Sequence, residues 1–205
     1  MDRPPGTMRA MIRRITIIQG HPDATARHFC HALADAYADG VREAGGQVRI
    51  VDVARLDFPI LRSQAAWEEG ELPETLGPAQ NAIGWAEHLL FVFPLWMGGM
   101  PALLSAFLEQ VLRPGFASMP AEGPHLPKKL LTGRSARCLV TMGMPAAVYR
   151  YFFRAHALKS LERNVLGMSG IAPIHKTLVG SVAALGPEDR AKWLAKVRAI
   201  GQRLD

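Results

Sequence analysis

Short apolar runs alternate along this chain with stretches in which apolar residues recur at helical spacing. Five runs have the length and composition of buried strands: residues 11–19, 47–53, 88–93, 134–141 and 171–179. The third is apolar after its first residue and stops at Pro94, which predicts a strand buried at the centre of a sheet.

Helices are predicted between the strands because apolar residues there lie three and four positions apart. From residue 29 to about 44, Phe29, Leu33 and Tyr37 share one face, and a glycine pair ends the helix. Four more helices are predicted: residues 78–87, a helix opened by Pro101, one from Pro145 through residue 161, and residues 187–204.

This alternation, with no internal repeat, predicts an α/β fold: a doubly wound three-layer sandwich with a five-stranded parallel sheet in the order 2-1-3-4-5. Residues 1–10 are predicted to be a flexible leader and residues 11–205 one domain. No apolar run approaches the roughly 18 residues of a membrane span, and no apolar segment follows the basic N-terminus as in a signal peptide. We therefore expect a cytoplasmic protein and not an integral membrane protein.

Composition narrows the possible partners. The formal net charge of +6 suits anionic ligands, but Lys and Arg are scattered and not interleaved with aromatic residues, so no nucleic-acid partner is expected. Cys30 and Cys138 are predicted to be free, buried and reduced. His28 and His31 flank Cys30, but no fourth ligand follows at a suitable spacing, so solvated histidines are favoured over a metal site.

The loops after the first, third and fourth strands are predicted to meet at the carboxyl edge of the sheet, where such folds bind ligands. The first is a polar turn from Gly20 into a helix N-terminus, so Thr25, Arg27 and the helix dipole are predicted to hold a phosphate. For such a loop alone, a simple N-cap at Thr25 and a turn residue at His21 would be the better interpretation. Neither a Walker loop nor a GxGxxG pattern is present.

The second loop follows Pro94 and is apolar, with two glycines at which the backbone can approach a flat molecule. It is predicted to be the wall of a planar cofactor's pocket, formed by Pro94, Leu95, Trp96, Met97 and Gly98. The third loop, after Thr141, also contains a glycine, Gly143.

Three motifs at these loops resemble those of the flavodoxin-like NAD(P)H:quinone oxidoreductases, DT-diaphorase-like flavoproteins and their shorter bacterial relatives. They are GHPDA…FCHALADAY from Gly20, FVFPLWMGGMPALLSAFLEQVLRPGFA from Phe91 and TMGMPAAVY from Thr141. The resemblance implies a flavodoxin-like fold and a bound flavin. It places His21, Thr25 and Phe29 along the phosphate and ribityl chain, Pro94, Leu95, Trp96 and Met97 at the isoalloxazine edge, and Thr141, Gly143 and Met144 on its pyrimidine side.

The resemblance also implies an activity: a ping-pong, two-electron hydride transfer from NAD(P)H through flavin N5 to a quinone or similar acceptor. Backbone N–H groups of Gly143 and Met144 would stabilise the reduced ring. Tyr149 matches the family's catalytic tyrosine, and His156 lies close in sequence to the place of the histidine that assists it. Ser118 replaces a bulky aromatic residue of the family, and Met144 a glycine of its larger members, so the acceptor stays open.

Two alternatives are an ancillary flavoprotein subunit of a potassium efflux system, docking through residues 56–76 or 113–131, and an electron-transfer flavodoxin. The positive charge and the bulky apolar pocket argue against the flavodoxin. FMN is preferred to FAD because the chain is short and shows no obvious adenine site. A homodimer is expected, because the resemblance implies a pocket completed by a neighbouring subunit and because residues 113–119 are apolar. In and after this stretch, Phe116, Met119 and His125 are predicted to be exposed.

Overall fold

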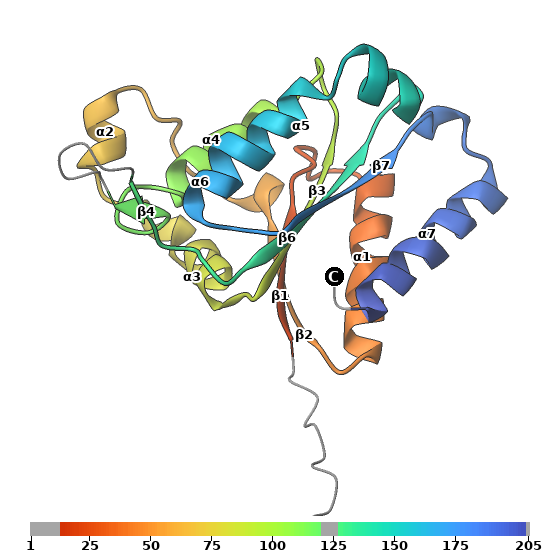
Figure 1. Ribbon diagram of the computed structural model, residues 1–205, viewed down its shortest axis with the longest axis horizontal. Helices are drawn as coiled ribbons and strands as arrows, with labels where there is room; N and C mark the ends of the chain where they lie inside the picture. The colour runs from red at the N-terminus through yellow and green to blue at the C-terminus, as the bar shows by residue number, and fades with distance from the viewer. Residues whose placement is uncertain (1–12, 120–126, 204–205) are drawn as a thin grey trace, which may run out of the picture.

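The computed structural model describes residues 13–119 and 127–203, so the predicted leader and His125 lie outside the described residues. At its centre is a five-stranded parallel sheet in the order β2-β1-β3-β6-β7 (Figure 1). Its strands are β1 Arg14–Gln19, β2 Gln47–Asp52, β3 His88–Pro94, β6 Ser135–Thr141 and β7 Ile174–Val179. In sequence order within the sheet this is 2-1-3-4-5, so the predicted fold class is confirmed.

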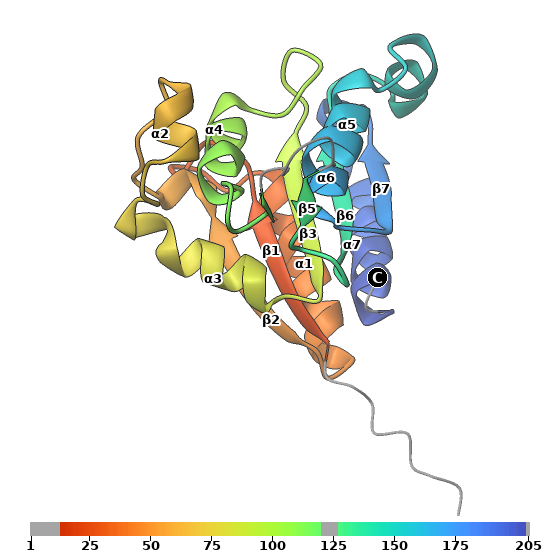
Figure 2. The same cartoon turned by 60° about the vertical axis from the view of Figure 1, so that its left-hand side comes forward.

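Helices cover both faces of the sheet (Figures 1 and 2). One face carries α1 Phe29–Glu43 and α7 Pro187–Gln202, and the other carries α3 Gly77–Trp85, α4 Ala102–Val111, α5 His156–Ser160 and α6 Gly167–Ser169. Outside these layers lie a short helix, α2 Gln64–Glu68, and a small antiparallel pair, β4 Ser118–Met119 with β5 Lys128–Lys129. Single turns complete the described chain: 3₁₀ turns at Val53–Arg55, Glu74–Leu76 and Val182–Ala184, and π-helical segments at Val148–Phe152 and Leu161–Leu166.

Strand β3 lies at the centre because its residues can be buried on both faces. All seven are buried, and the strand pairs with β1 on one side and β6 on the other. The polar exception, His88, forms a 2.8 Å contact from Nδ1 to Ser135 Oγ. This confirms the predicted central strand.

The α1 and α7 helices approach each other closely at two glycines. A Cβ atom added at Gly40 would lie 2.0 Å from the carbonyl oxygen of Arg198, and one added at Gly201 would lie 2.3 Å from that of Tyr37. Both distances are far below van der Waals contact. Only glycine therefore allows the two backbones to meet as they do.

The predicted continuous helix from Pro145 is wrong. The segment Val148–Phe152 is a π-helical turn, Arg154 and Ala155 have φ values of 54° and 47°, and a new helix begins at His156. This left-handed pair breaks the helical repeat. Tyr149 is consequently buried, whereas the following aromatic residues are exposed: Tyr151, Phe152 and Phe153.

Exposure differs from prediction at one position after α4. Phe116 is half-buried and packs against the core cluster beneath α3 and α4, because the chain turns back there to form β4. Met119 is 48% exposed, as predicted. Cys30 and Cys138 are free and buried, also as predicted. In the described part of the chain, no helix is long and apolar enough to cross a bilayer.

Candidate functional site

The turn between β1 and α1 is held by its own side chains. Asp23 accepts hydrogen bonds from Thr25, at 2.8 Å from the backbone nitrogen and 2.6 Å from Oγ1, and its other oxygen lies 2.7 Å from His28 Nε2. The bond from the Thr25 hydroxyl, then that from His28 and then that from the Thr25 backbone hold the pKa of Asp23 well below its ordinary value. The carboxylate is therefore engaged within the turn.

Three histidines cluster beside this carboxylate, and two of them, His21 and His28, are stacked. The rings of His21 and His28 are parallel with centroids 3.8 Å apart, and His31 lies 5.5 Å from His21. Burial, and then the neighbouring His28 and His31, lower the pKa of His21 to about 4. Its Nδ1 accepts a hydrogen bond from the Asp23 backbone at 3.2 Å, so the proton of the neutral ring is on Nε2.

His28, and not Thr25, is the N-cap of α1. The backbone nitrogen of His28 donates to His31 Nδ1 at 3.0 Å, and the helix begins at Phe29. The simple N-cap interpretation of Thr25 is therefore wrong: its side chain bonds Asp23 instead. Sequence reasoning missed this role of the two histidines, although their spacing of three residues is that of a reciprocal cap.

The other residues predicted around the phosphate lie on different sides of the turn. Thr25 and Arg27 are exposed, and Arg27 forms an ion pair with Asp35, further along α1. Phe29 is half-buried, and the guanidinium carbon of Arg190 in α7 lies 4.9 Å from its ring centroid. His21 and Thr25 thus lie at the turn, whereas Arg27 lines a hollow between α1 and α7 and Phe29 contacts Arg190 of α7.

The wall loop is a tight turn above the carboxyl edge of the sheet (Figure 2). Trp96 and Gly99 exchange backbone hydrogen bonds of 2.9 and 2.8 Å, and Met97 and Gly98 between them have φ values of 48° and 80°. Both central residues are left-handed, the conformation of a type I′ turn. Met97 is fully exposed and Trp96 is 49% exposed, so the turn presents apolar side chains to solvent.

Two contacts join the three loops. The Trp96 ring lies edge-on to His21 at 6.2 Å between centroids. Leu95, directly after Pro94, donates its backbone N–H to the carbonyl oxygen of Thr141 at 2.7 Å. The turn after β1, the wall loop and the loop after β6 therefore meet at one edge of the sheet, as predicted.

The third loop offers open backbone at this edge. Thr141 is buried and its Oγ1 lies 3.1 Å from Cys30 Sγ, so its hydroxyl is engaged in the core. Gly143 is exposed, and a Cβ atom added there would meet nothing within 4 Å. Met144 is half-buried, and its carbonyl oxygen accepts from Ser181 at 3.0 Å.

Tyr149 lies beneath the wall turn. Its side chain is buried, and its hydroxyl donates to the Gly98 carbonyl oxygen at 3.4 Å. Burial raises the pKa of Tyr149, so the phenol is neutral near pH 7. His156 is exposed at the start of α5. That Tyr149 or His156 takes part in proton transfer stays a prediction.

Comparison with known proteins places this edge in context. Residues 13–204 match a protein family described as having a flavodoxin-like fold. The chain belongs to that flavodoxin-like family. An uncharacterized NAD(P)H oxidoreductase of Haemophilus influenzae is 28% identical over 180 residues, covering 86% of this chain and 87% of that protein. An FMN-dependent NADH:quinone oxidoreductase of Nitratidesulfovibrio vulgaris is 26% identical over 198 residues, covering 85% and 89%.

One solved structure shares the fold, and one further relative matches over a shorter stretch. An NAD(P)H:quinone oxidoreductase from Methanothermobacter marburgensis superposes with a TM-score of 0.77 at 24% identity, over 94% of this chain and 97% of that one. The glutathione-regulated potassium-efflux ancillary protein KefG of Escherichia coli is 40% identical, but over 67 residues only, 32% of this chain and 33% of that protein. The predicted resemblance to NAD(P)H:quinone oxidoreductases is confirmed, and the two relatives above that match over most of their length are oxidoreductases by name.

Proposed function

We propose that this flavodoxin-like protein is an FMN-dependent NAD(P)H oxidoreductase that reduces a quinone or a similar acceptor. One observation carries the proposal: the histidine turn, the exposed apolar wall and the open Gly143 loop meet at one sheet edge through the His21–Trp96 and Leu95–Thr141 contacts. An edge of this kind can hold a phosphate at one end and a flat ring at the other. Full-length relatives with NAD(P)H and FMN in their names support it.

The residues present fit a flavin phosphate. The first turn of α1, all of it described, holds no acidic side chain, and the first backbone N–H groups of a helix lack intrahelical acceptors. Asp23, the carboxylate of this turn, is already bonded to Thr25 and His28. The Asp23 carboxylate stays ionised beside the turn, so the backbone N–H groups and the positive end of the helix dipole would hold the phosphate against one acidic neighbour.

The residues of the wall and of the third loop fit a planar ring. Trp96 and Met97 would shield one side, and the backbone at Gly143 leaves space for close approach. Bound FMN would accept a hydride from NAD(P)H and deliver it to the acceptor. Tyr149 would hold its proton beneath the wall and fix the turn through Gly98.

Two finer points belong to the same proposal. We place a second copy of the chain against the exposed Tyr151, Phe152 and Phe153, because aromatic side chains clustered on a surface favour association. This replaces residues 113–119 as the expected dimer surface, since Phe116 and Ala117 there turn inward.

A reducing compartment such as the cytoplasm suits the two unpaired cysteines.

The ancillary role in potassium efflux is less well supported, because the similarity to KefG covers a third of each chain. A distinguishing result would be a flavin that NAD(P)H reduces but that no quinone reoxidises.

The direct test begins with the cofactor. Purified protein should release FMN on heating, identified by absorption and mass, and NADPH or NADH added under nitrogen should bleach the flavin before a benzoquinone restores its colour. The variant Gly143→Val fills space that is empty in this fold, so FMN binding should weaken at least about tenfold while the melting temperature hardly changes.

Gly77→Val is the matched control, because Gly77 also meets nothing within 4 Å and lies far along the chain at the start of α3. Equal FMN affinity in the two variants would refute the placement of the ring. A wild-type protein that binds neither FMN nor FAD would refute the function.

A further inference from the structure

A methionine stands in the wall turn, residues 96–99, where the backbone favours other residues. Met97 and Gly98 both have left-handed φ values, 48° and 80°. A type I′ turn usually takes asparagine, aspartate or glycine at its first central position, because a larger side chain is unfavourable in left-handed backbone. Non-glycine residues held in this conformation collect at functional sites, which indicates a function for the Met97 side chain.

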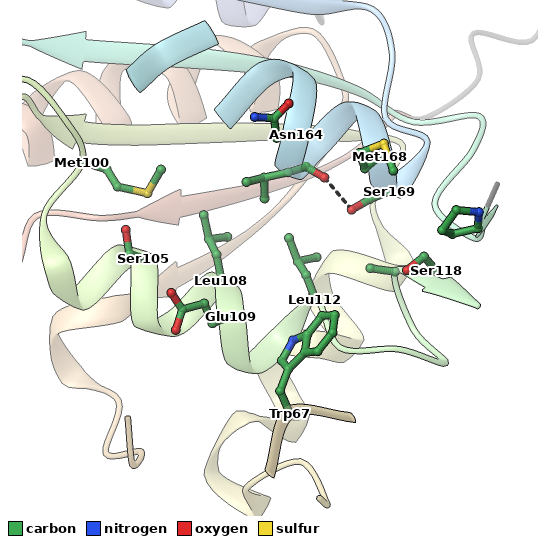
Figure 3. A pocket seen from close by; sticks show the side chains of 13 residues that line it. Trp67, Met100, Ser105, Leu108, Glu109, Leu112, Ser118, Asn164, Met168 and Ser169 are labelled. Carbon is green, nitrogen blue, oxygen red and sulfur yellow. Dashed lines mark hydrogen bonds between the residues drawn. The ribbon is translucent and has the colours of Figure 1, made fainter. Parts of the chain in front are cut away.

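Met97 is the most exposed methionine in the part of the chain that the structure describes. It is fully exposed, whereas Met119, the next, reaches 48%. Met100 and Met168 line the groove between α4 and the segment that runs from Leu161–Leu166 into α6 (Figure 3). The methionines that are partly or wholly covered are Met100, Met119, Met142, Met144 and Met168. A reagent dissolved in water therefore reaches the Met97 sulfur first among them.

The Met97 thioether is open to oxidation, whereas the thiols of the chain are not. Cys30 and Cys138 are buried, but a thioether at the surface reacts with hydrogen peroxide without losing a proton. A lone pair of the sulfur attacks one peroxide oxygen, the S–O bond forms, the O–O bond breaks and water leaves. The sulfur loses two electrons, and the peroxide gains them.

Oxidation of Met97 would change the surface that the turn offers to a flat ring. Met97 follows Trp96, whose ring lies 6.2 Å from that of His21 between centroids. A sulfoxide is polar where the thioether was apolar, and covering a polar group with a ring is costly unless it is hydrogen-bonded. The favourable contact between a thioether sulfur and an aromatic ring is lost as well.

We propose that Met97 is a reversible oxidation site for hydrogen peroxide, and that its sulfoxide weakens the binding of a flat ring at the wall turn. The first part depends on the turn alone, and the second rests on the proposed function. The modification is undone when two thiols of a reductant become a disulfide and the sulfoxide oxygen leaves as water. Peroxide would therefore lower the affinity for FMN, and reduction would restore it.

The first measurement is the order of oxidation. The FMN-free protein is treated with hydrogen peroxide, samples are stopped with catalase at intervals, and their peptides are analysed by mass spectrometry for the gain of an oxygen atom. The sulfoxide of Met97 should form at least about threefold faster than that of Met119. A rate at Met97 equal to or below that at Met119 overturns the inference.

The second measurement is FMN affinity before and after peroxide. Treatment should weaken FMN binding to the wild type at least about fivefold, and methionine sulfoxide reductases A and B with dithiothreitol should restore it. Met97→Leu keeps an apolar side chain without sulfur. Because this substitution also changes the wall, each variant is compared with its own untreated sample, and the affinity of Met97→Leu should change less than about twofold. Met119→Leu is the matched control and should lose affinity as the wild type does.

Each other outcome has a definite meaning. Unchanged FMN affinity in the oxidised wild type, or an equal loss in Met97→Leu, overturns the inference. A fall in melting temperature that accompanies the loss of affinity shows that oxidation unfolds the protein, which also overturns it. If the untreated wild type binds no FMN, the proposed function fails, and the order of oxidation alone decides whether Met97 is the oxidation site.

Discussion

The two faces of the sheet are built differently. On one, α1 and α7 are uninterrupted helices whose backbones touch at Gly40 and Gly201. On the other, the chain after β6 breaks into π-helical segments and short helices with Arg154 and Ala155 left-handed between them, and a groove of about 440 Å³ remains open beside α4. One face is closed by backbone contact, and the other keeps space between its elements.

This difference suggests that the α1–α7 face mainly stabilises the fold, whereas the opposite face leaves room for ligands. A close-packed pair of regular helices tolerates little change in volume, whereas strained turns and open grooves are the features that functional sites use. The proposed flavin edge draws on both, since α1 supplies its N-terminus and the irregular face supplies Tyr149 and the groove. Substitutions in α1 and α7 should therefore lower the free energy of unfolding more than substitutions on the opposite face do.

The largest effect is expected where the two helices touch. Gly40→Ala would put a methyl group 2.0 Å from the Arg198 carbonyl oxygen, so the helices must separate, and we expect a loss of about 3 kcal/mol in the free energy of unfolding. Urea denaturation measures it. Gly77→Ala, in open space, should change stability by less than about 1 kcal/mol, and equal losses in the two variants would contradict the contact.

A second comparison replaces one buried leucine by alanine on each face of the sheet and measures the loss in the free energy of unfolding. Leu33→Ala, in α1 at 0% exposure, should cost about 3 kcal/mol. Leu108→Ala, in a wall of the groove, removes atoms that already border empty space, so its cost should be smaller by about 1 kcal/mol. Identical unfolding free energies for the two variants would show that the groove side is as tightly packed as the other.

A third test concerns the start of α1, where the face covered by α1 and α7 meets the carboxyl edge of the sheet. The pKa of His21 is about 4 when folded and 6.5 ordinarily, so as the pH falls through this interval the unfolded chain takes up the proton first. The stability that neutral His21 contributes is present above pH 6.5 and is lost as the pH falls toward 4. His28, His31 and Asp23 face the ring, and any loss from Asp23 comes at lower pH.

His21→Asn keeps a hydrogen-bond acceptor near the Asp23 backbone but cannot titrate. The unfolding free energy of this variant, measured by urea denaturation at several pH values, should fall less steeply than that of the wild type between pH 6.5 and 4. Parallel curves would assign the pH dependence to other groups.

The smallest effect on stability is expected at the wall turn. Tyr149→Phe removes a long hydrogen bond, 3.4 Å to Gly98, so we expect a loss of about 0.5 kcal/mol in the free energy of unfolding. Quinone reduction separates a structural from a chemical role: a fall in kcat of at least about tenfold at unchanged FMN affinity would mark Tyr149 as a proton donor. An unchanged kcat would leave it a positioning residue for the turn.

The sheet could be predicted because its signals are local. The apolar run ending at Pro94 has the length and composition of a buried strand, and the glycine pair at Gly45 marks the end of α1. The convergence of the three loops followed from the parallel order of the strands. These inferences need only the residues themselves and the handedness of the connections.

What could not be predicted depends on tertiary contacts. Nothing in the residues near Arg154 and Ala155 indicates left-handed backbone, since both types favour a continuous helix. The stacking of His21 on His28 appears only once the turn folds back on α1. The groove is a space between α4 and a segment about 60 residues later in the chain. Helical periodicity describes each helix by itself, so it does not predict the space between two of them.

The buried cysteines have a practical consequence. Burial raises the pKa of Cys30 to about 11 and that of Cys138 to about 12, so neither thiol ionises appreciably near neutrality and neither should react with maleimides. These are the chain's two cysteines. A single new cysteine at the fully exposed Met97, in Met97→Cys, would therefore accept a fluorescent label alone and could report when a ring settles against the turn.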